Sequence, residues 1–325
     1  MQRIVALGLC LLGLAAAASQ KAASPEAKAR QMIQAFGPGQ DGFELAARLI
    51  ALGPKILPVV REGIAKPINR PAVPFLMQAE GWLLWNAAPP KERNTELARK
   101  VLQGILRCAD RAVRYLKVNF DAYCKLGAVG MPPALAEARS LARNVDPNKF
   151  PANLTYLVQM LAECGDDSLA GELPKMLFAK PAYQREAAAF ILRGIAQRGG
   201  KIKVATPGLL RALTDEEERT AKNAAQALYF QKDPAVLKDV FPLLASDRSL
   251  TRALAAELVE GLSGHDPGFK ADAPREEREK VIAQIRKLLF DRGLLPSAEQ
   301  SPGAQSQAQS QPAVQVPPIE LSTTH

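Results

Sequence analysis

Histidines, cysteines and clustered carboxylates most often carry catalysis or hold metal ions, and this chain of 325 residues brings few of them together. It contains two histidines and four cysteines. His325 is the last residue, and His265 lies in the loop sequence GLSGHDPGFKAD with Asp266 and Asp272. A metal site there would need further ligands at a recognisable spacing, which the sequence does not supply. No phosphate-binding glycine-rich loop, nucleophile elbow or zinc-protease helix motif occurs, so we expect no catalytic residue, metal or cofactor.

Residues 1–18 have the layout of a secretory signal peptide. Arg3 supplies a positive charge, residues 4–14 are apolar, and a run of small residues follows. The apolar stretch is too short for a comfortable membrane span. We expect cleavage near Ala18 and an exported protein, either periplasmic or secreted. A lipoprotein leader would use Cys10, but the residue before it is too large for the usual lipobox.

Loss of the leader would leave Cys108, Cys124 and Cys164. An odd number of cysteines in an oxidising compartment allows one intramolecular disulfide at most. If residues 95–126 form one helix, Cys108 and Cys124 lie about 24 Å apart, which is beyond disulfide reach. Cys124 with Cys164 is then the feasible pair, on neighbouring antiparallel helices. A helix break near Asn119 would make the first pair feasible again, and three buried thiols without a disulfide are the further alternative.

Positive charge is concentrated in the N-terminal half of a chain whose formal net charge is +9. Basic and acidic residues number eight and four over residues 20–70, twelve and seven over 71–150, and twenty-one and twenty-two from 151 onward. Four basic side chains share one face of a predicted helix: Lys100, Arg107, Arg111 and Arg114. This basic stripe could bind an acidic protein, a cell-wall polymer, lipid headgroups or nucleic acid, or it could be a solvated helix face.

Two tryptophans, Trp82 and Trp85 in GWLLWN, lie one helical turn apart. Such a pair can form a ligand platform or an interface hot spot. Because the surrounding helix is so apolar, we expect both side chains to belong to the core.

An internal repeat is the strongest pattern in the sequence. Pro174, Pro207 and Pro242 are 33 and 35 residues apart and follow Leu173, Thr206 and Phe241. Each is followed by an apolar pair, a polar turn and a segment with paired alanines. The last of these segments places Leu254 and Leu258 on one apolar stripe at helical spacing. Each unit therefore reads as two antiparallel helices, the second of them amphipathic.

Prolines mark where helices begin in this pattern. The segment ALGPKILPVVREGI places Pro54 and Pro58 four residues apart. Because proline lacks an amide hydrogen, it is tolerated in the first turn of a helix, where amide donors have no partner. We predict that one helix stops after Gly53 and that the next one begins at these prolines.

This pattern resembles HEAT-like helical repeats, and LGPKILPVVREGI is similar to the linker and first helix of such a repeat in bacterial secreted proteins. The resemblance is clear over residues 167–264 and again around 42–64, with room for roughly three diverged units between Pro58 and Pro174. It implies an all-α fold, an α-solenoid of stacked antiparallel helix pairs, over residues 19–295. The period also overlaps that of tetratricopeptide repeats, whose pattern of Trp, Gly, Tyr and Pro is not visible.

The C-terminal part carries three further signals. Thr214 to Glu217 reads as a capping box at a helix start. Residues 275–291 read as a final helix with Val281, Ile285 and Leu288 on one face, which we expect to cap the stack. Residues 296–325 contain six Gln, five Ser and five Pro but two charged residues, so we expect a disordered tail.

The resemblance implies binding rather than catalysis. HEAT-like families generally use the concave surface of the stack to hold other proteins, so we expect an extracytoplasmic protein-binding scaffold. A binder of an anionic polymer or membrane surface through the basic stripe is the alternative, and nucleic acid is the least favoured partner. Some HEAT-like proteins are lyases that attach bilin chromophores, and others are glycosylases that excise alkylated bases from DNA. Both activities are intracellular, so the export signal argues against them.

Overall fold

The computed structural model describes residues 23–37, 40–109, 116–143, 152–266 and 268–296, and these residues form an all-α structure without a strand. The prediction of an all-α fold is therefore confirmed for this part of the chain. Its sixteen α-helices are α2 (Pro25–Ala35), α3 (Gly42–Ala51), α4 (Leu57–Ala65), α5 (Val73–Ala87), α6 (Thr95–Ala109), α7 (Leu116–Cys124), α8 (Met131–Arg143), α9 (Ala152–Cys164), α10 (Asp167–Ala170), α11 (Pro174–Leu177), α12 (Ala182–Gln197), α13 (Thr206–Ala212), α14 (Glu218–Gln231), α15 (Leu237–Val240), α16 (Ser249–Ser263) and α17 (Arg275–Asp291).

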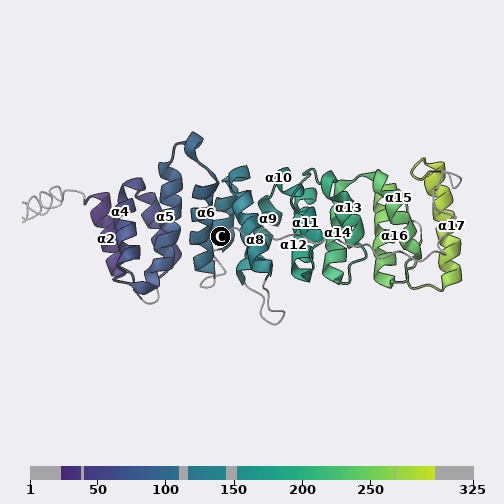
Figure 1. Cartoon of the computed structure of the whole chain (residues 1–325), viewed down its shortest axis with the longest axis horizontal. Coiled ribbons are helices and arrows are strands. Elements are labelled where there is room, and N and C mark those ends of the chain that lie inside the picture. Colours follow the sequence, from purple (N-terminus) through teal and green to yellow (C-terminus); the bar gives the residue numbers. More distant parts are fainter. Residues whose placement is uncertain (1–22, 38–39, 110–115, 144–151, 267, 297–325) are drawn as a thin grey trace, which may run out of the picture.

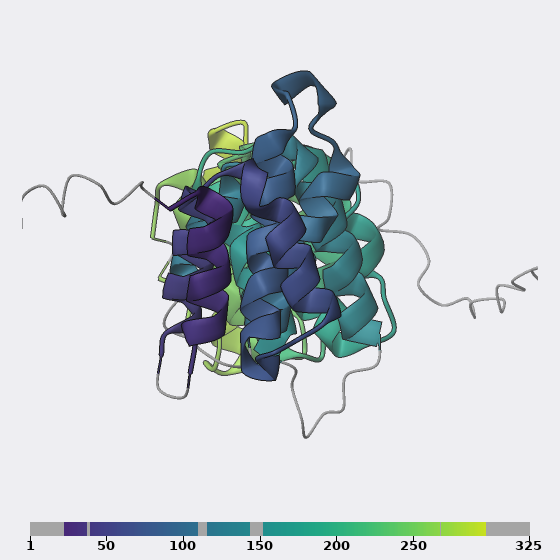
Figure 2. The same ribbon diagram turned by 90° about the vertical axis from the view of Figure 1, so that its left-hand side faces the viewer.

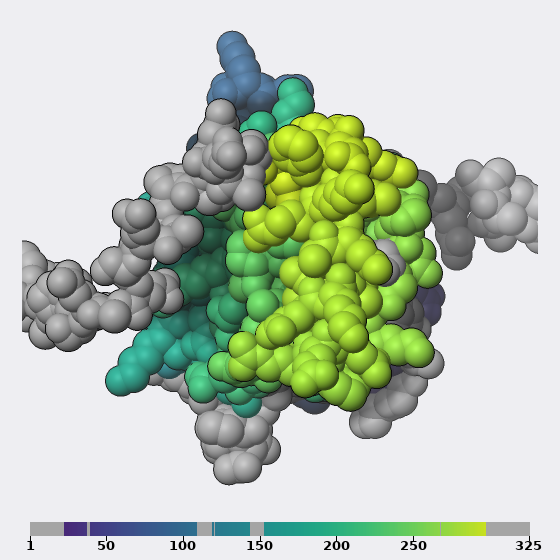
Figure 3. Space-filling view, turned by 90° about the vertical axis from the view of Figure 1, so that its right-hand side faces the viewer, coloured from purple at the N-terminus to yellow at the C-terminus, as the bar shows by residue number. Residues whose placement is uncertain are grey.

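The helices stand side by side, broadly in chain order, and make an elongated body (Figure 1). α2 lies at one end and α17 at the other. Seen from the N-terminal end, the helices lie behind one another with their axes close to parallel (Figure 2). At the opposite end, the C-terminal residues that include α17 cover part of the end face (Figure 3). Helix contacts accordingly join elements that are close in the chain, such as α4 with α5 and α14 with α16.

Contacts between helices sort the C-terminal half into two rows. α9, α12, α14 and α16 contact one another in succession, and we call them the long row. Of the shorter helices, α11 contacts α13, and α15 contacts α16 of the long row. We call α11, α13 and α15 the short row. Members of the long row have 13 to 16 residues, whereas those of the short row have 4, 7 and 4. α11 contacts α12, α13 contacts α14 and α15 contacts α16, so the two helices of each predicted pair are in contact but differ in length.

Prolines open helices as predicted. Gly53 ends the preceding segment with a φ of 80°, which favours glycine. Pro54 then begins the 3₁₀ helix η1 (Pro54–Ile56), and Pro58 lies in the first turn of α4. Pro207 occupies the same place in α13. Both prolines of the ALGPKILPVVREGI segment therefore sit where a missing amide donor costs least.

The predicted capping box is wrong. α14 begins at Glu218 with Glu217 as its N-cap, so Thr214 lies outside the helix. The Thr214 hydroxyl donates a hydrogen bond back to the Arg211 carbonyl at 2.9 Å, which closes the end of α13. The Glu217 amide, which Thr214 would accept in a capping box, donates instead to Oδ1 of Asp215 at 2.9 Å, and the Asp215 amide donates back to the Ala212 carbonyl at 3.1 Å.

Small residues let neighbouring helices of the long row pack closely. A Cβ atom on Gly194 of α12 would collide with the backbone carbonyl of Ala162 on α9. Ala188, Ala221 and Ala255 are fully buried on α12, α14 and α16. The core built on these faces runs continuously from Trp85 to Leu295, and a second core cluster lies among α2 to α5 and reaches Cys108.

The final helix has the bounds that the sequence predicts. Of its expected apolar face, Ile285 is buried, and Val281 and Leu288 are half-buried. The guanidinium of Arg286 lies 4.8 Å from the ring centroid of Phe241, in the 3₁₀ helix η8 (Phe241–Ala245). The expected signal peptide and nearly all of the expected tail fall on residues 1–22 and 297–325, outside the described residues.

A buried ion pair joins two successive units of the repeat. Nε and Nη2 of Arg185 donate to the two carboxylate oxygens of Asp215 at 2.6 and 3.0 Å, and both side chains are largely buried. Burial opposes ionisation of Asp215. Hydrogen bonds from Arg185 and from the Glu217 amide outweigh it, so the pKa of Asp215 lies below its usual value.

We expect Asp215→Asn to lower the free energy of unfolding by about 2 kcal/mol at pH 7, because it removes a charge-assisted hydrogen-bond pair. Since the folded pKa of Asp215 is depressed, its contribution is present above the unfolded pKa of about 3.9 and is lost as pH falls through the folded value. Urea unfolding at pH 7 and near pH 3 measures the difference at each pH. Glu216→Gln, at an exposed member of the same cluster, is the control. An Asp215→Asn effect of equal size at both pH values would contradict this account.

Candidate binding surface

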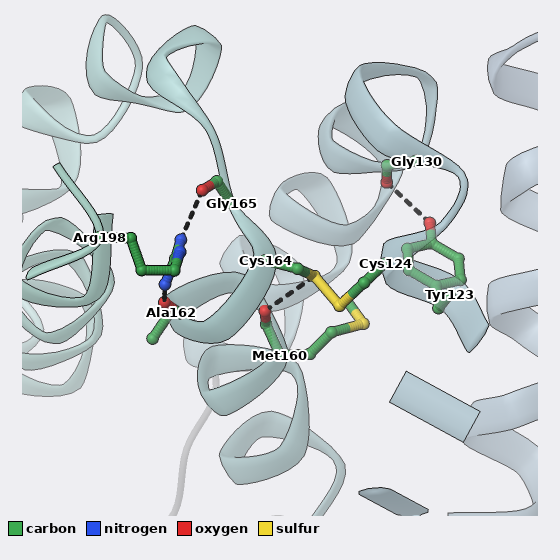
Figure 4. The surroundings of a disulfide bond; sticks show 8 residues. All are labelled: Tyr123, Cys124, Gly130, Met160, Ala162, Cys164, Gly165 and Arg198. Atoms are coloured by element: carbon green, nitrogen blue, oxygen red, sulfur yellow. Dashed lines mark hydrogen bonds between the residues drawn. A yellow bond between two sulfur atoms is a disulfide. The ribbon is translucent and has the colours of Figure 1, made fainter. Parts of the chain in front are cut away.

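Cys124 and Cys164 are joined by a disulfide that links the C-terminal ends of α7 and α9 (Figure 4). Their Cα atoms lie 5.4 Å apart and the residues are 40 apart in sequence. The sequence analysis gives this pair as the feasible one if residues 95–126 form a single helix. α6 and α7 are separate helices that contact each other, and Cys108 lies buried in α6, outside the disulfide.

The surroundings of the disulfide fix the position of α9. The Tyr123 hydroxyl is buried and donates to the Gly130 carbonyl at 2.7 Å, and this burial raises the pKa of Tyr123. On the other side, the guanidinium of Arg198 donates to the carbonyls of Ala162 and of Gly165, the latter at 2.6 Å (Figure 4). α9 is thereby tied to α7 by a covalent bond and to the end of α12 by hydrogen bonds.

The long row carries a groove of about 710 Å³ across α9, α12 and the start of α14. A second groove of about 650 Å³ crosses α12, α14 and α16 and shares Arg193 and Gln197 with the first. We call the two together the long-row groove. Its apolar and aromatic lining includes Leu154, Val158, Tyr183, Phe190, Tyr229 and Phe230.

Arg193 sits at the junction of the two grooves. Its guanidinium lies 4.4 Å from the ring centroid of Phe190 and donates to Asn223 Oδ1 at 2.8 Å and to Gln226 Oε1 at 3.0 Å. Burial lowers the pKa of Arg193, but an arginine remains protonated in proteins. Tyr229, which is 45% exposed, packs edge-on against Phe230. Arginine and aromatic side chains are the types enriched at interface hot spots.

Four side chains that line the groove are separated in the sequence by about one repeat length. Gln159, Arg193, Gln226 and Glu260 come from four successive helices of the long row, 34, 33 and 34 residues apart, and all four line it. Equivalent positions of successive repeats face the same way, so the regular spacing of these four residues could in principle be recognised in the sequence. The sequence analysis did not recognise this spacing, because it is visible only when the repeats are aligned with one another residue by residue.

The two tryptophans do not form a joint platform. Trp85 is 7% exposed and belongs to the core, with Arg93 5.3 Å from its ring centroid. Trp82 is half-buried and lines a separate groove of about 690 Å³ on α3, α5 and α7, which we call the N-terminal groove. The core assignment therefore holds for Trp85, and Trp82 packs against the same core cluster while also lining the groove.

Half of the basic stripe lies within the described residues. Lys100 and Arg107 are exposed on α6 two turns apart, and Val101 and Ile105 are buried behind them. Arg111 and Arg114 lie outside the described residues. The structure therefore brings together two of the four predicted side chains.

His265 is exposed in the loop after α16. Within the described ranges, no group of three or more histidines, cysteines and carboxylates is arranged to hold a metal ion. None of the helices in these ranges has both the length and the apolar character needed to cross a membrane.

Removal of the disulfide tests how α9 is held. We expect Cys124→Ser/Cys164→Ser to lower the free energy of unfolding by about 4 kcal/mol, the chain-entropy value for a closed loop of 40 residues. Thermal unfolding of the wild type with and without reductant, beside the double variant and a Cys108→Ser control, measures the effect. An oxidised wild type whose melting temperature does not fall on reduction would contradict this role for the bond.

Comparison with protein-family models and with curated proteins finds no match to this chain.

Proposed function

We propose that this chain is a HEAT-like α-solenoid that acts outside the cytoplasm as a protein-binding scaffold, with no catalysis of its own. The observation that carries the proposal is the continuity of the long-row groove, whose two halves share Arg193 and Gln197. A surface that crosses four successive helices suits an extended segment of another protein better than a compact small molecule.

The side chains of the long-row groove support this proposal. Phe190 and Tyr229 offer aromatic area to a partner, and Arg193 offers a charge that is already held by Asn223 and Gln226. A side chain fixed before binding loses less conformational entropy when a partner docks. Charges of both signs line both halves of the groove, which suits a partner segment of mixed charge. The charged lining residues are Glu163, Glu186, Arg193, Arg198 and Arg219 in the first half and Arg193, Glu257 and Glu260 in the second.

Two features support a location outside the cytoplasm. The first is the signal-peptide layout of residues 1–18. The second is the disulfide between Cys124 and Cys164, because such bonds persist in oxidising compartments and are rare in the cytosol. We propose a periplasmic or secreted protein on these grounds.

Site-specific photocrosslinking tests the docking surface. We expect a photoreactive phenylalanine analogue in place of Tyr229, expressed in the native host and irradiated, to crosslink one protein in stoichiometric amount. The same analogue in place of Phe178 should not, because that residue follows α11 on the short row. The two positions are matched controls, since Tyr229 is 45% exposed and Phe178 49%.

The partner found in this way is then tested with Arg193→Ala, which we expect to weaken binding at least tenfold if Arg193 is a hot spot. Equal crosslinking from both positions, or capture from Phe178 alone, would rule out the long-row groove as the docking surface. Absence of any crosslinked protein from Tyr229 would count against the scaffold itself.

Binding of an anionic surface is a second candidate function. The observation in its favour is that Lys100 and Arg107 are both exposed on one face of α6, as the sequence predicts. Two cations at this spacing would attract phosphate or sulfate groups at a distance, and salt would screen the attraction.

We expect Lys100→Glu/Arg107→Glu to weaken binding to phosphatidylglycerol vesicles and to dextran sulfate at low salt, if this surface is used. Lys201→Glu/Lys238→Glu carries the same change of charge at exposed residues elsewhere and serves as the control. Cosedimentation at several salt concentrations measures both. Binding that survives the α6 substitutions, or falls equally with the control, would remove this candidate.

A further inference from the structure

Two carboxamide side chains meet beneath the N-terminal groove. Gln78 on α5 donates from Nε2 to Oδ1 of Asn119 on α7 at 2.6 Å. Gln78 is 3% exposed and Asn119 is 9% exposed. Both nevertheless line the groove of about 690 Å³, beside Trp82.

The pair leaves hydrogen-bonding capacity unused. Oε1 of Gln78 and Nδ2 of Asn119 are buried and have no hydrogen-bond partner among the described residues. Exchanging oxygen and nitrogen in both amides would still leave one donor and one acceptor unpaired. Buried polar atoms in native proteins are nearly always paired, so an unpaired donor beside an unpaired acceptor calls for an explanation.

We propose that Gln78 and Asn119 bind the main chain of an extended peptide segment from a partner protein. In an extended chain, the N–H and C=O of one residue point the same way and form a pair of hydrogen bonds with a facing donor and acceptor. The unpaired acceptor would take the peptide N–H and the unpaired donor would reach its C=O. This inference rests on the proposed function of protein binding and adds a second groove with a defined chemistry.

The walls of the N-terminal groove suit a neutral peptide backbone. Trp82 and Ile50 are half-buried and offer apolar contact, and the ring of Phe43 is braced by Phe75 with centroids 5.3 Å apart. Apolar side chains beside a hydrogen bond lower the local dielectric and strengthen it. The exposed carboxylate of Glu44 lies on the lining, which disfavours an anionic ligand.

Access requires a small movement of the two carboxamides. The unpaired atoms are themselves shielded, whereas other atoms of both residues face the groove. The terminal torsions of glutamine and asparagine have broad, shallow preferences, so rotation toward a ligand is inexpensive. The hydrogen bond between Gln78 and Asn119 would be kept, while the unpaired oxygen of Gln78 and the unpaired nitrogen of Asn119 bond to the peptide.

Selection from a library of random hexapeptides against the immobilised full chain supplies the probe. The strongest binder is resynthesised with each main-chain amide replaced in turn by an ester, which removes one N–H donor and weakens the carbonyl beside it. We expect one ester position to weaken binding about tenfold by fluorescence polarisation, and the others to have little effect.

Gln78→Met/Asn119→Leu is the matching protein variant, because it removes both partners while keeping similar shapes. Such paired replacement is close to neutral for stability, so the melting temperature should be unchanged or raised. We expect this variant to lose the affinity gained from the critical amide, so that peptide and ester bind it equally weakly. Phe190→Ala, in the long-row groove, should leave binding of the hexapeptide unchanged.

Several outcomes would overturn the inference. These are a library without binders, a binder unaffected by Gln78→Met/Asn119→Leu, and a binder sensitive to no ester but dependent on an Asn or Gln side chain. If Phe190→Ala abolishes binding of the hexapeptide and Gln78→Met/Asn119→Leu does not, this inference is wrong, and the long-row groove remains as a docking surface. Photocrosslinking from Tyr229 decides the proposed function independently.

Discussion

The constraint on which the structure depends is that none of its short helices can bury its apolar face alone. α12 shows how this is solved: Gly194 presses against the backbone of α9, and Ala188 is fully buried on the same helix. Side chains this small let neighbouring helices approach closely, so the buried core passes from one helix to the next without a single centre. The length of the body follows from the number of helices in the row. The groove follows in the same way, because each added helix extends the same surface.

Covalent and polar contacts between helices of the row hold the closely packed surface in one shape. The disulfide and the hydrogen bonds of Arg198 hold α9 on both sides, and Arg185 with Asp215 joins the next two units. Arg198 and Ala162 are themselves part of the lining of the long-row groove, whereas the disulfide cysteines, Arg185 and Asp215 are not among its lining residues. A groove whose walls are fixed before docking loses less entropy on binding than one that must be ordered.

Local signals were readable from the sequence, and tertiary ones were not. Pro58 and the final helix were predictable because a missing amide donor and a helical apolar stripe act within one element. The capping box at Thr214 failed because the neighbouring Asp215 accepts the Glu217 amide in its place, and the same carboxylate binds Arg185 of another helix, which no local pattern shows. In the same way, the cysteine pair could be named only as one of several alternatives, because its feasibility depended on where one helix ends.

The candidate sites show the same division. Arg193 lies in a segment that the sequence predicts to be helical, yet its hydrogen bonds go to Asn223 and Gln226 on the next helix of the long row. Gln78 and Asn119 are 41 residues apart and belong to no motif, so their contact could not be predicted from spacing. Surface chemistry of this kind emerges from the stacking of units rather than from any single unit.

The central claim, that successive helix pairs extend in a row instead of closing into one globule, is tested most directly by an end-to-end distance. Spin labels attached through non-canonical amino acids at Lys28 on α2 and Lys287 on α17, both exposed, leave the cysteines untouched. A compact sphere of the same chain length would be roughly 50 Å across. The account predicts a distance distribution centred beyond that diameter, and a distribution centred well within it would contradict the row of helices.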